Sequence, residues 1–135
     1  MIKEDYVSFE TAKLLKEKGF DESTSMVYMS YGDLCKLKRY DSIRNSNYND
    51  ITKSYFEYTA PTLQMAMKWL REVYNLFIST STWLRHKDGT VQYYYEIRNL
   101  NNKDFETIAG STIAEFDSPE KTYEAAIMCC LKNLI

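Results

Sequence analysis

The chain has 135 residues, of which 44% are hydrophobic and 27% are charged, and its formal net charge is −2. Such a chain is long enough to bury a core without metal or disulfide staples, and we expect one soluble domain over residues 1–135. The near-neutral charge excludes a strong overall attraction to nucleic acid or to an anionic membrane. No apolar run reaches the ~20 residues of a membrane-spanning helix, so we expect no membrane partner.

The cysteines and the N-terminus indicate the compartment. The three cysteines are odd in number and two of them, Cys129 and Cys130, are adjacent, which does not fit a disulfide framework. Adjacent side chains on a helix point in different directions, so we expect these two to be packing residues rather than ligands of one metal. Residues 1–5 lack the apolar segment of a signal peptide. We therefore expect a reducing, cytoplasmic setting.

The first 40 residues predict a helix and a hairpin. A helix from about Ser8 to Lys18 has a capping serine at its start and Gly19 directly after its end. The segment 25–40 is then rich in β-formers around Gly32-Asp33, which favours a tight turn between two strands. The second of these strands is polar enough to lie at the edge of a sheet.

The segment 41–59 has no apolar period and is rich in Asn, Ser, Asp and Tyr. This composition is typical of a loop, although a loop of that length is uncommon in a compact domain. We expect a flexible loop at about residues 41–59, and the least ordered internal part of the chain.

The next segment predicts the central helix. Pro61 suits a first helical turn, and apolar residues then recur at helical spacing as far as Tyr74. Met65 and Trp69 widen the apolar arc beyond what a helix packed on one side needs. We therefore expect Trp69 to be buried in the core rather than to form part of a binding surface.

The clearest hairpin signal is Asp88-Gly89, which lies between two segments rich in β-formers. If these two residues form a two-residue turn, Trp83 lies directly opposite Tyr94 on the face turned away from the helices, among polar neighbours. Such a pair can simply stabilise its hairpin, but aromatic residues with a polar rim are also typical of an interface hot spot. The candidate partner-binding residues are Trp83, Arg85, Tyr94 and Glu96.

The end of the chain predicts a short strand and a long helix. The strand lies around residues 112–116, and the helix starts at Asp117-Ser118-Pro119-Glu120, which combines a cap, a proline in the first turn and an acidic residue near the positive end of the dipole. The predicted order is α-β-β-α-β-β-(β)-α. Short antiparallel hairpins with a polar outer face indicate an α+β fold, a two-layer sandwich with helices on one face of an antiparallel sheet of two hairpins.

Three segments also carry a resemblance. VSFETAKLLKEKGFDE at residues 7–22, APTLQMAMKWLRE at 60–72 and SPEKTYEAAIMCCLKNLI at 118–135 resemble a family of small proteins from phages, prophages and mobile elements of gut Bacteroidetes. The three segments occur in the same order as in that family, whereas the hairpins match only in outline. The resemblance implies a bacterial, cytoplasmic setting and assigns no catalytic or binding residue.

No motif for catalysis, a cofactor or a metal is present. The single histidine, His86, has no Cys-x-x-Cys pair to join it, and the 4 glycines are not spaced as a phosphate-binding loop. Carboxylate pairs such as Glu120 and Glu124 fit a solvated helix face. We therefore name no catalytic, cofactor-binding or metal-binding residue.

These observations favour a small non-catalytic protein-interaction module, such as an adaptor or inhibitor, which acts through a protein partner or self-association. The alternative is a small enzyme whose site is assembled from scattered residues. A single-stranded nucleic-acid binder is a weaker alternative, because the near-neutral charge opposes it. The cations that favour this last alternative lie near several tyrosines and are Lys36, Lys38, Arg39 and Arg44.

Overall fold

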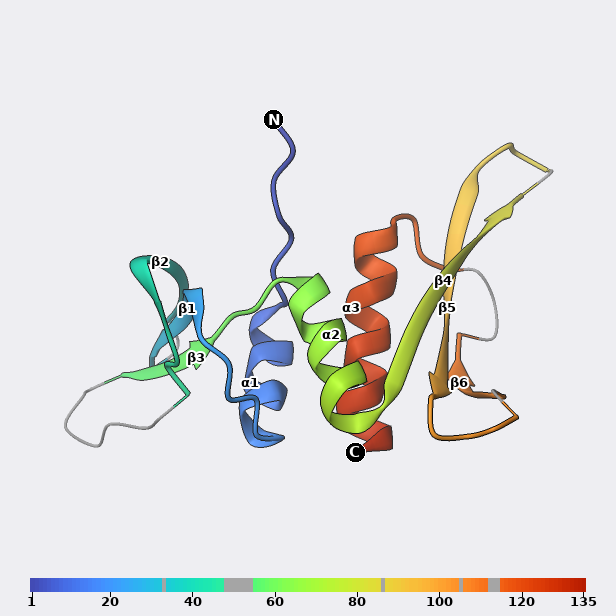
Figure 1. Ribbon diagram of the computed structural model, residues 1–135. Helices are drawn as coiled ribbons and strands as arrows, with labels where there is room; N and C mark the ends of the chain where they lie inside the picture. Colours follow the sequence, from blue (N-terminus) through green and yellow to red (C-terminus); the bar gives the residue numbers. More distant parts are fainter. Residues whose placement is uncertain (33, 48–54, 86, 105, 112–114) are drawn as a thin grey trace. The chain divides into compact units, whose positions relative to one another are not determined.

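The computed structural model describes residues 1–32, 34–47, 55–85, 87–104, 106–111 and 115–135 (Figure 1). They form an α+β protein with two three-stranded antiparallel sheets, which confirms the predicted fold class. The chain divides into two compact units, Met1–Thr62 and Leu63–Ile135, and each unit holds one of the sheets. None of the helices in the described part of the chain is long and apolar enough to cross a membrane.

The first unit consists of one helix and a sheet with the strand order β2-β1-β3 (Figure 1). The side chain of Ser8 caps the helix by accepting a hydrogen bond from the backbone N–H of Thr11 at 3.2 Å, as the sequence predicts. Phe9 holds the helix on the sheet, because its ring meets the rings of Tyr28 and Tyr58 edge-on. The elements are α1 (Phe9–Glu17), β1 (Thr24–Tyr31), β2 (Leu34–Arg44) and β3 (Phe56–Thr59).

The segment 41–59 contains more regular structure than its composition indicates. Strand β2 continues to Arg44 and β3 occupies the last four positions, so the expectation of a loop is wrong at both ends. The reason is tertiary, because the polar side chains of this segment bond to one another and to its backbone. The backbone N–H of Ser46, for example, donates to the hydroxyl of Thr59 at 3.0 Å, and both residues are buried. Residues 48–54 lie outside the described residues, so flexibility there stays a prediction.

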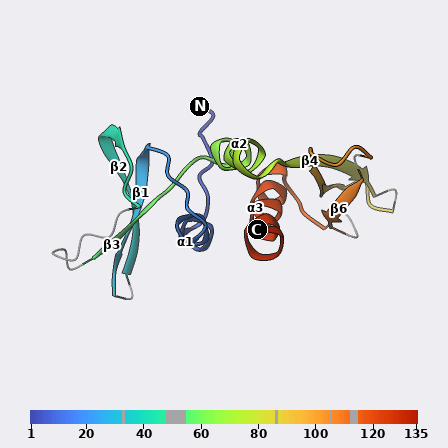
Figure 2. The ribbon, with the colours of Figure 1, turned by 60° about the horizontal axis from the view of Figure 1, so that its bottom comes forward.

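The second unit joins two helices to a sheet with the strand order β4-β5-β6. Both α2 and α3 contact β4, and α3 also contacts β5. Figure 2 shows α2 leading directly into β4. Trp69 on α2 is only 7% exposed, which confirms its predicted place in the core. The elements are α2 (Leu63–Tyr74), β4 (Leu76–Leu84), β5 (Val91–Asn99), β6 (Thr107–Gly110), α3 (Pro119–Cys129) and a short π-helical turn, η1 (Cys130–Leu134).

The third strand of this sheet lies earlier in the chain than predicted. The paired segment is β6, whereas the expected strand at 112–116 contributes only a single bridge between Phe116 and Tyr93, and residues 112–114 lie outside the described residues. Gly110 explains the position of β6. A Cβ atom there would lie 2.9 Å from the carbonyl oxygen of Tyr95, so only glycine allows this close approach of the two backbones.

The register of the β4–β5 hairpin differs by two residues from the predicted one. A two-residue turn would pair Lys87 with Thr90, but the backbone N–H of Arg85 donates to the carbonyl of Thr90 at 2.8 Å. The cause is the carboxylate of Asp88, which accepts hydrogen bonds from the backbone N–H and the hydroxyl of Thr90, at 3.0 and 2.7 Å. Asp88 and Gly89 therefore belong to a longer loop, closed by an Asx turn.

This register overturns one predicted contact. Trp83 lies opposite Gln92, and Tyr94 lies opposite Ser81, so Trp83 and Tyr94 are not a directly opposed pair. A shift by two residues leaves every side chain on its predicted face, because successive side chains alternate along a strand. Trp83 and Tyr94 accordingly still share the outer face of the sheet.

Candidate functional site

The edges of the two sheets differ in how they are protected against pairing with another chain. Among the described strands, β2, β3, β4 and β6 each have one unpaired side. Strands β3 and β6 have four residues each, and the pairing of β6 is further interrupted by a register shift. Charged residues and short length both hinder an edge strand from pairing with another chain. The charges on β2 are Lys36, Lys38, Arg39, Asp41 and Arg44.

Strand β4 has neither protection. Its nine residues, LFISTSTWL, include no charge, no proline and no glycine. A long uncharged edge strand is the structure onto which another strand adds most readily. We therefore take the open edge of β4 as the candidate functional site.

The backbone groups at this edge follow from the hydrogen bonds at the two ends of the hairpin. The backbone N–H of Arg85 donates to Thr90 at one end, and the backbone N–H of Leu100 donates to Asn75 at the other, both at 2.8 Å. Hydrogen bonding alternates along an antiparallel pair, so the odd-numbered residues of β4 bond to β5. The even-numbered residues direct their N–H and C=O groups to the open edge, where the described residues place no strand. These are Leu76, Ile78, Thr80, Thr82 and Leu84.

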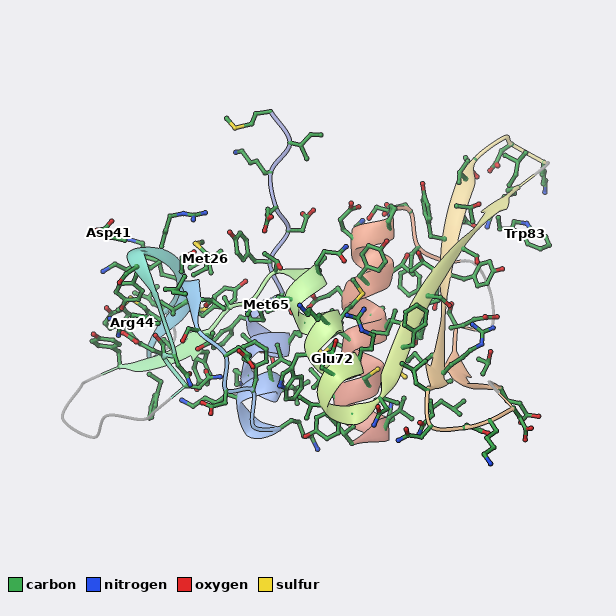
Figure 3. The ribbon with its side chains drawn as sticks, viewed as in Figure 1. Met26, Asp41, Arg44, Met65, Glu72 and Trp83 are labelled. Carbon is green, nitrogen blue, oxygen red and sulfur yellow. The ribbon has the colours of Figure 1, made fainter. Side chains whose placement is uncertain are left out.

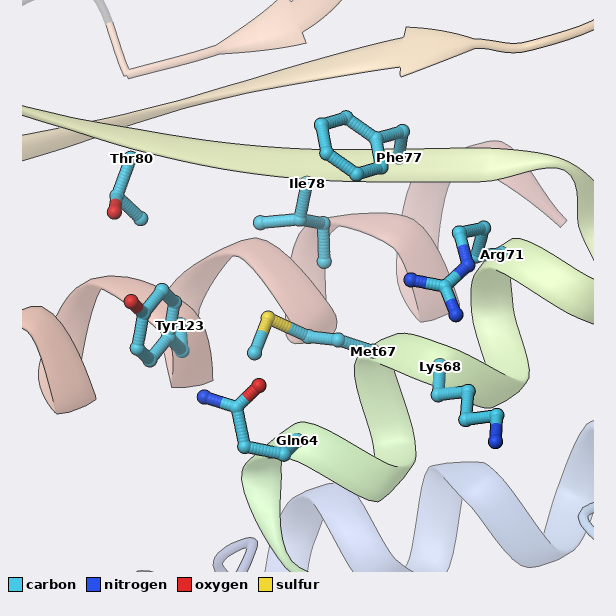
Figure 4. A pocket seen from close by; sticks show the side chains of 8 residues that line it. All are labelled: Gln64, Met67, Lys68, Arg71, Phe77, Ile78, Thr80 and Tyr123. Atoms are coloured by element: carbon cyan, nitrogen blue, oxygen red, sulfur yellow. The ribbon is translucent and has the colours of Figure 1, made fainter.

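A groove runs along the first half of this edge (Figure 4). Its volume is about 430 Å³, and both Phe77 and Ile78 line it although they lie on opposite faces of β4. The groove therefore follows the edge of the strand rather than one of its faces. On the α2 side it is lined by Lys68 and Arg71, and the described lining residues include no carboxylate. The full lining is Gln64, Met67, Lys68, Arg71, Phe77, Ile78, Thr80 and Tyr123.

The outer face of the sheet carries exposed aromatic side chains beside the same edge. Trp83 projects from the hairpin and is 61% exposed (Figure 3), and Phe77, six residues earlier on the same face, is 39% exposed. Phe77 is not among the predicted partner-binding residues, although the two-residue period counted back from Trp83 places it on this face. Exposed aromatic side chains next to an open backbone edge are suited to contact an added strand.

The other predicted partner-binding residues lie on the hairpin but are held by their neighbours. Arg85 donates to the amide oxygen of Gln92 at 2.9 Å, and the carboxylate of Glu96 accepts from Arg98 at 2.8 Å. Tyr94 is half-buried. The structure thus places Trp83, Tyr94 and Glu96 on one face, with Trp83 as the most exposed of the three. Their role in binding a partner stays a prediction.

The first unit contains a second polar cluster, around the buried carboxylate of Glu57. It accepts hydrogen bonds from the hydroxyl of Tyr40 at 2.7 Å and from the guanidinium of Arg44 at 2.9 Å. The guanidinium also stacks on the ring of Tyr40, 4.0 Å from its centroid. Burial and the hydrogen bond to Glu57 raise the pKa of Tyr40 to about 12. This cluster is a structural link between β2 and β3, and it engages one of the cations on which the nucleic-acid alternative rests.

The second unit contains two cysteines, Cys129, which is half-buried, and Cys130, which is buried. Cys130 is fully buried, and burial raises the pKa of its thiol to about 12. Burial and the neighbouring Cys129 also raise the pKa of Tyr95 to about 12. A thiol that stays protonated is a poor nucleophile and a poor metal ligand, so we assign Cys130 a packing role.

Comparison of the chain with models of protein families, with curated proteins and with solved structures finds no match.

Proposed function

We propose that this chain is a small non-catalytic protein-interaction module, of phage or mobile-element origin, that binds its partner by accepting an added strand at the open edge of β4. The observation that carries the proposal is the contrast among the edges. The other described edge strands are charged or short, whereas β4 offers nine uncharged residues. The proposed origin rests on the sequence resemblance alone.

Strand addition divides affinity and specificity between backbone and side chains. The outward N–H and C=O groups of alternate β4 residues would bond to the added strand whatever its sequence. The groove beside Phe77 and Ile78 would receive alternate side chains of that strand and so select among sequences. Trp83 would cover the other end of the added strand on the outer face.

Substitution of Thr80, in the middle of the edge, tests the proposal. Thr80→Pro removes an outward N–H without removing a donor of the β4–β5 ladder, because that ladder uses the odd-numbered residues. Thr80→Val is the matched control, since it keeps the N–H and the preference for a strand. Each variant is immobilised and exposed to a lysate of the native host. We expect a stoichiometric partner to be captured by the parent and by Thr80→Val, and to be lost with Thr80→Pro.

A second measurement identifies the surface in contact. In the captured complex, the backbone amides of Ile78, Thr80 and Thr82 should exchange with solvent at least tenfold more slowly than in the free chain, because they become bonded to the added strand. Circular dichroism establishes that Thr80→Pro is folded. Equal capture by a folded Thr80→Pro variant, with unchanged amide exchange, would contradict strand addition.

A further inference from the structure

We propose that the strand added to β4 is the β4 strand of a second copy of this chain, antiparallel and centred on Thr80. The inference rests on the proposed function and names the partner. It follows from three properties of β4: the symmetry of its sequence, the direction of its outward backbone groups, and the position of its exposed aromatic residues.

The sequence of β4 reads alike by residue type in both directions. From either end, LFISTSTWL gives leucine, an aromatic residue, a β-branched residue, serine and then the central Thr80. A two-fold contact between identical chains needs this property, because residue i meets residue j and residue j meets residue i. A strand that binds a foreign peptide has no need of it. With Thr80 on the two-fold axis, residues of the same type therefore lie opposite each other along the whole strand.

The direction of the backbone groups selects the same register. When Thr80 lies on the axis, Ile78 lies opposite Thr82 of the second copy, and Leu76 lies opposite Leu84 of the second copy. All of these are even-numbered residues, whose N–H and C=O groups point to the open edge. Each such pair can exchange two backbone hydrogen bonds. A shift by one residue would place these groups opposite residues whose backbone is already bonded to β5, and the ladder would fail.

The same register joins the exposed aromatic residues. Phe77 lies opposite Trp83 of the second copy, and by symmetry the contact occurs twice on the outer face. These are non-hydrogen-bonded pairs, in which the Cα atoms are only about 4.5 Å apart and the side chains are in close contact. Phe77 is 39% exposed and Trp83 is 61% exposed in the single chain, so both have surface to bury. Because β4 contains no charged residue, no like charges lie opposite each other within the two paired strands.

Cysteine cross-linking distinguishes this register from every other. The two copies of residue 80 would have Cα atoms about 5.5 Å apart, which is within the range of a disulfide. The two copies of residue 82 would be displaced by four positions, or about 13 Å along the strand, which is too far. The test compares Thr80→Cys with Thr82→Cys under mild oxidation, both in a Cys35→Ser background, because Cys35 is an exposed thiol. We expect a covalent dimer from Thr80→Cys alone, with an 80–80 bridge identified by mass spectrometry.

Sedimentation of the parent chain separates failure of this inference from failure of the proposed function. We expect a monomer–dimer equilibrium that Thr80→Pro abolishes and Thr80→Val preserves. A parent chain that stays monomeric to about 1 mM, a concentration that reveals even weak association, would overturn self-pairing, as would equal cross-linking of both cysteine variants. Strand addition would still stand if a different protein were captured and then lost with Thr80→Pro. Both proposals fail if Thr80→Pro changes neither self-association nor capture.

Discussion

Single residues show how this chain satisfies polar groups that it buries. Glu57 would be costly to bury alone, but Tyr40 and Arg44 each donate to its carboxylate. The ammonium of Lys16 also donates to the backbone carbonyl of Glu57, at 3.2 Å. The sequence could not reveal this cluster, because its members are up to 41 positions apart and each is of a type common on surfaces. The core position of Trp69 could be predicted from the sequence, because the helical period around it depends only on neighbouring residues.

The pKa of Tyr40 tests the Glu57 cluster. Burial and the carboxylate of Glu57 raise this pKa to about 12, so Glu57→Gln should lower it toward the ordinary value of about 10. A tyrosine with a raised pKa stabilises the fold fully below pH 10 and loses that contribution as the pH rises from 10 through 12. The absorbance of tyrosinate, followed in a titration to alkaline pH, measures the change in this pKa. Tyr95 serves as the internal control, because its pKa is also about 12 and it lies in the other unit. An unchanged titration would show that Glu57 does not act on Tyr40.

Replacement of Trp69 tests the core of the second unit. Trp69→Ala should lower the free energy of unfolding by about 3–5 kcal/mol, through lost burial and a cavity. Val73→Ala on the same helix is the matched control, since Val73 is 54% exposed, and its effect should stay within about 0.5 kcal/mol. Urea denaturation, followed by circular dichroism, measures both. Equal free energies of unfolding for the two variants would contradict the position of Trp69 in the core.

At the level of the elements, local signals were predictive and long-range pairing was not. The caps of the helices could be recognised because each cap and its partner are a few residues apart, as with Ser8 and Thr11. Asp88-Gly89 correctly located a hairpin, but the loop length depends on the hydrogen bonds of Asp88 to Thr90, which a dipeptide rule does not include. Strand β3 was missed because its four residues pair with β1, from which they are separated by β2 and the segment after it.

Gly110 allows a prediction about the position of β6. In Gly110→Ala, the new Cβ atom would lie 2.9 Å from the backbone carbonyl oxygen of Tyr95, and backbone cannot move aside as a flexible side chain can. We expect a loss of roughly 1–3 kcal/mol in unfolding free energy. Thr107→Ala, at an exposed position of the same strand, should have little effect. A Gly110→Ala variant that is as stable as the parent in thermal and urea unfolding would contradict the close approach of β6 to β5 at this residue.

For the whole molecule, the distribution of protected and unprotected edges matters more than any one residue. The lack of charge in residues 76–84 is visible in the sequence, but its meaning depends on strand order. An uncharged strand in the centre of a sheet is ordinary, whereas the same strand at an edge offers unpaired backbone groups to another strand. Strand order comes from long-range pairing, so the candidate site could be identified only once β4 was known to lie at the edge.

Trp83 provides a prediction that separates association from stability. Since Trp83 is exposed and lies opposite Gln92 rather than Tyr94, Trp83→Ala should change the free energy of unfolding of the monomer by no more than about 1 kcal/mol. If it contacts Phe77 of a second copy, the dimer dissociation constant should rise by roughly 30-fold or more. Sedimentation and thermal unfolding at low protein concentration measure the two effects. A large loss of monomer stability with unchanged association would show that Trp83 stabilises the hairpin and takes no part in dimer formation.

The shortness of β6 sets how far an assembly of these chains can grow. Pairing through β4 joins two sheets into one of six strands, and the outermost strand on each side is then β6. With four residues and a register shift against β5, β6 offers a third chain little ladder on which to continue. Fibrils grow because every added molecule exposes a fresh long edge. Here the long uncharged edge is used up by the first pairing, and the remaining long edge, β2, is protected by its charges. The chain should therefore form a closed pair, and higher concentration should convert monomers to dimers without producing filaments.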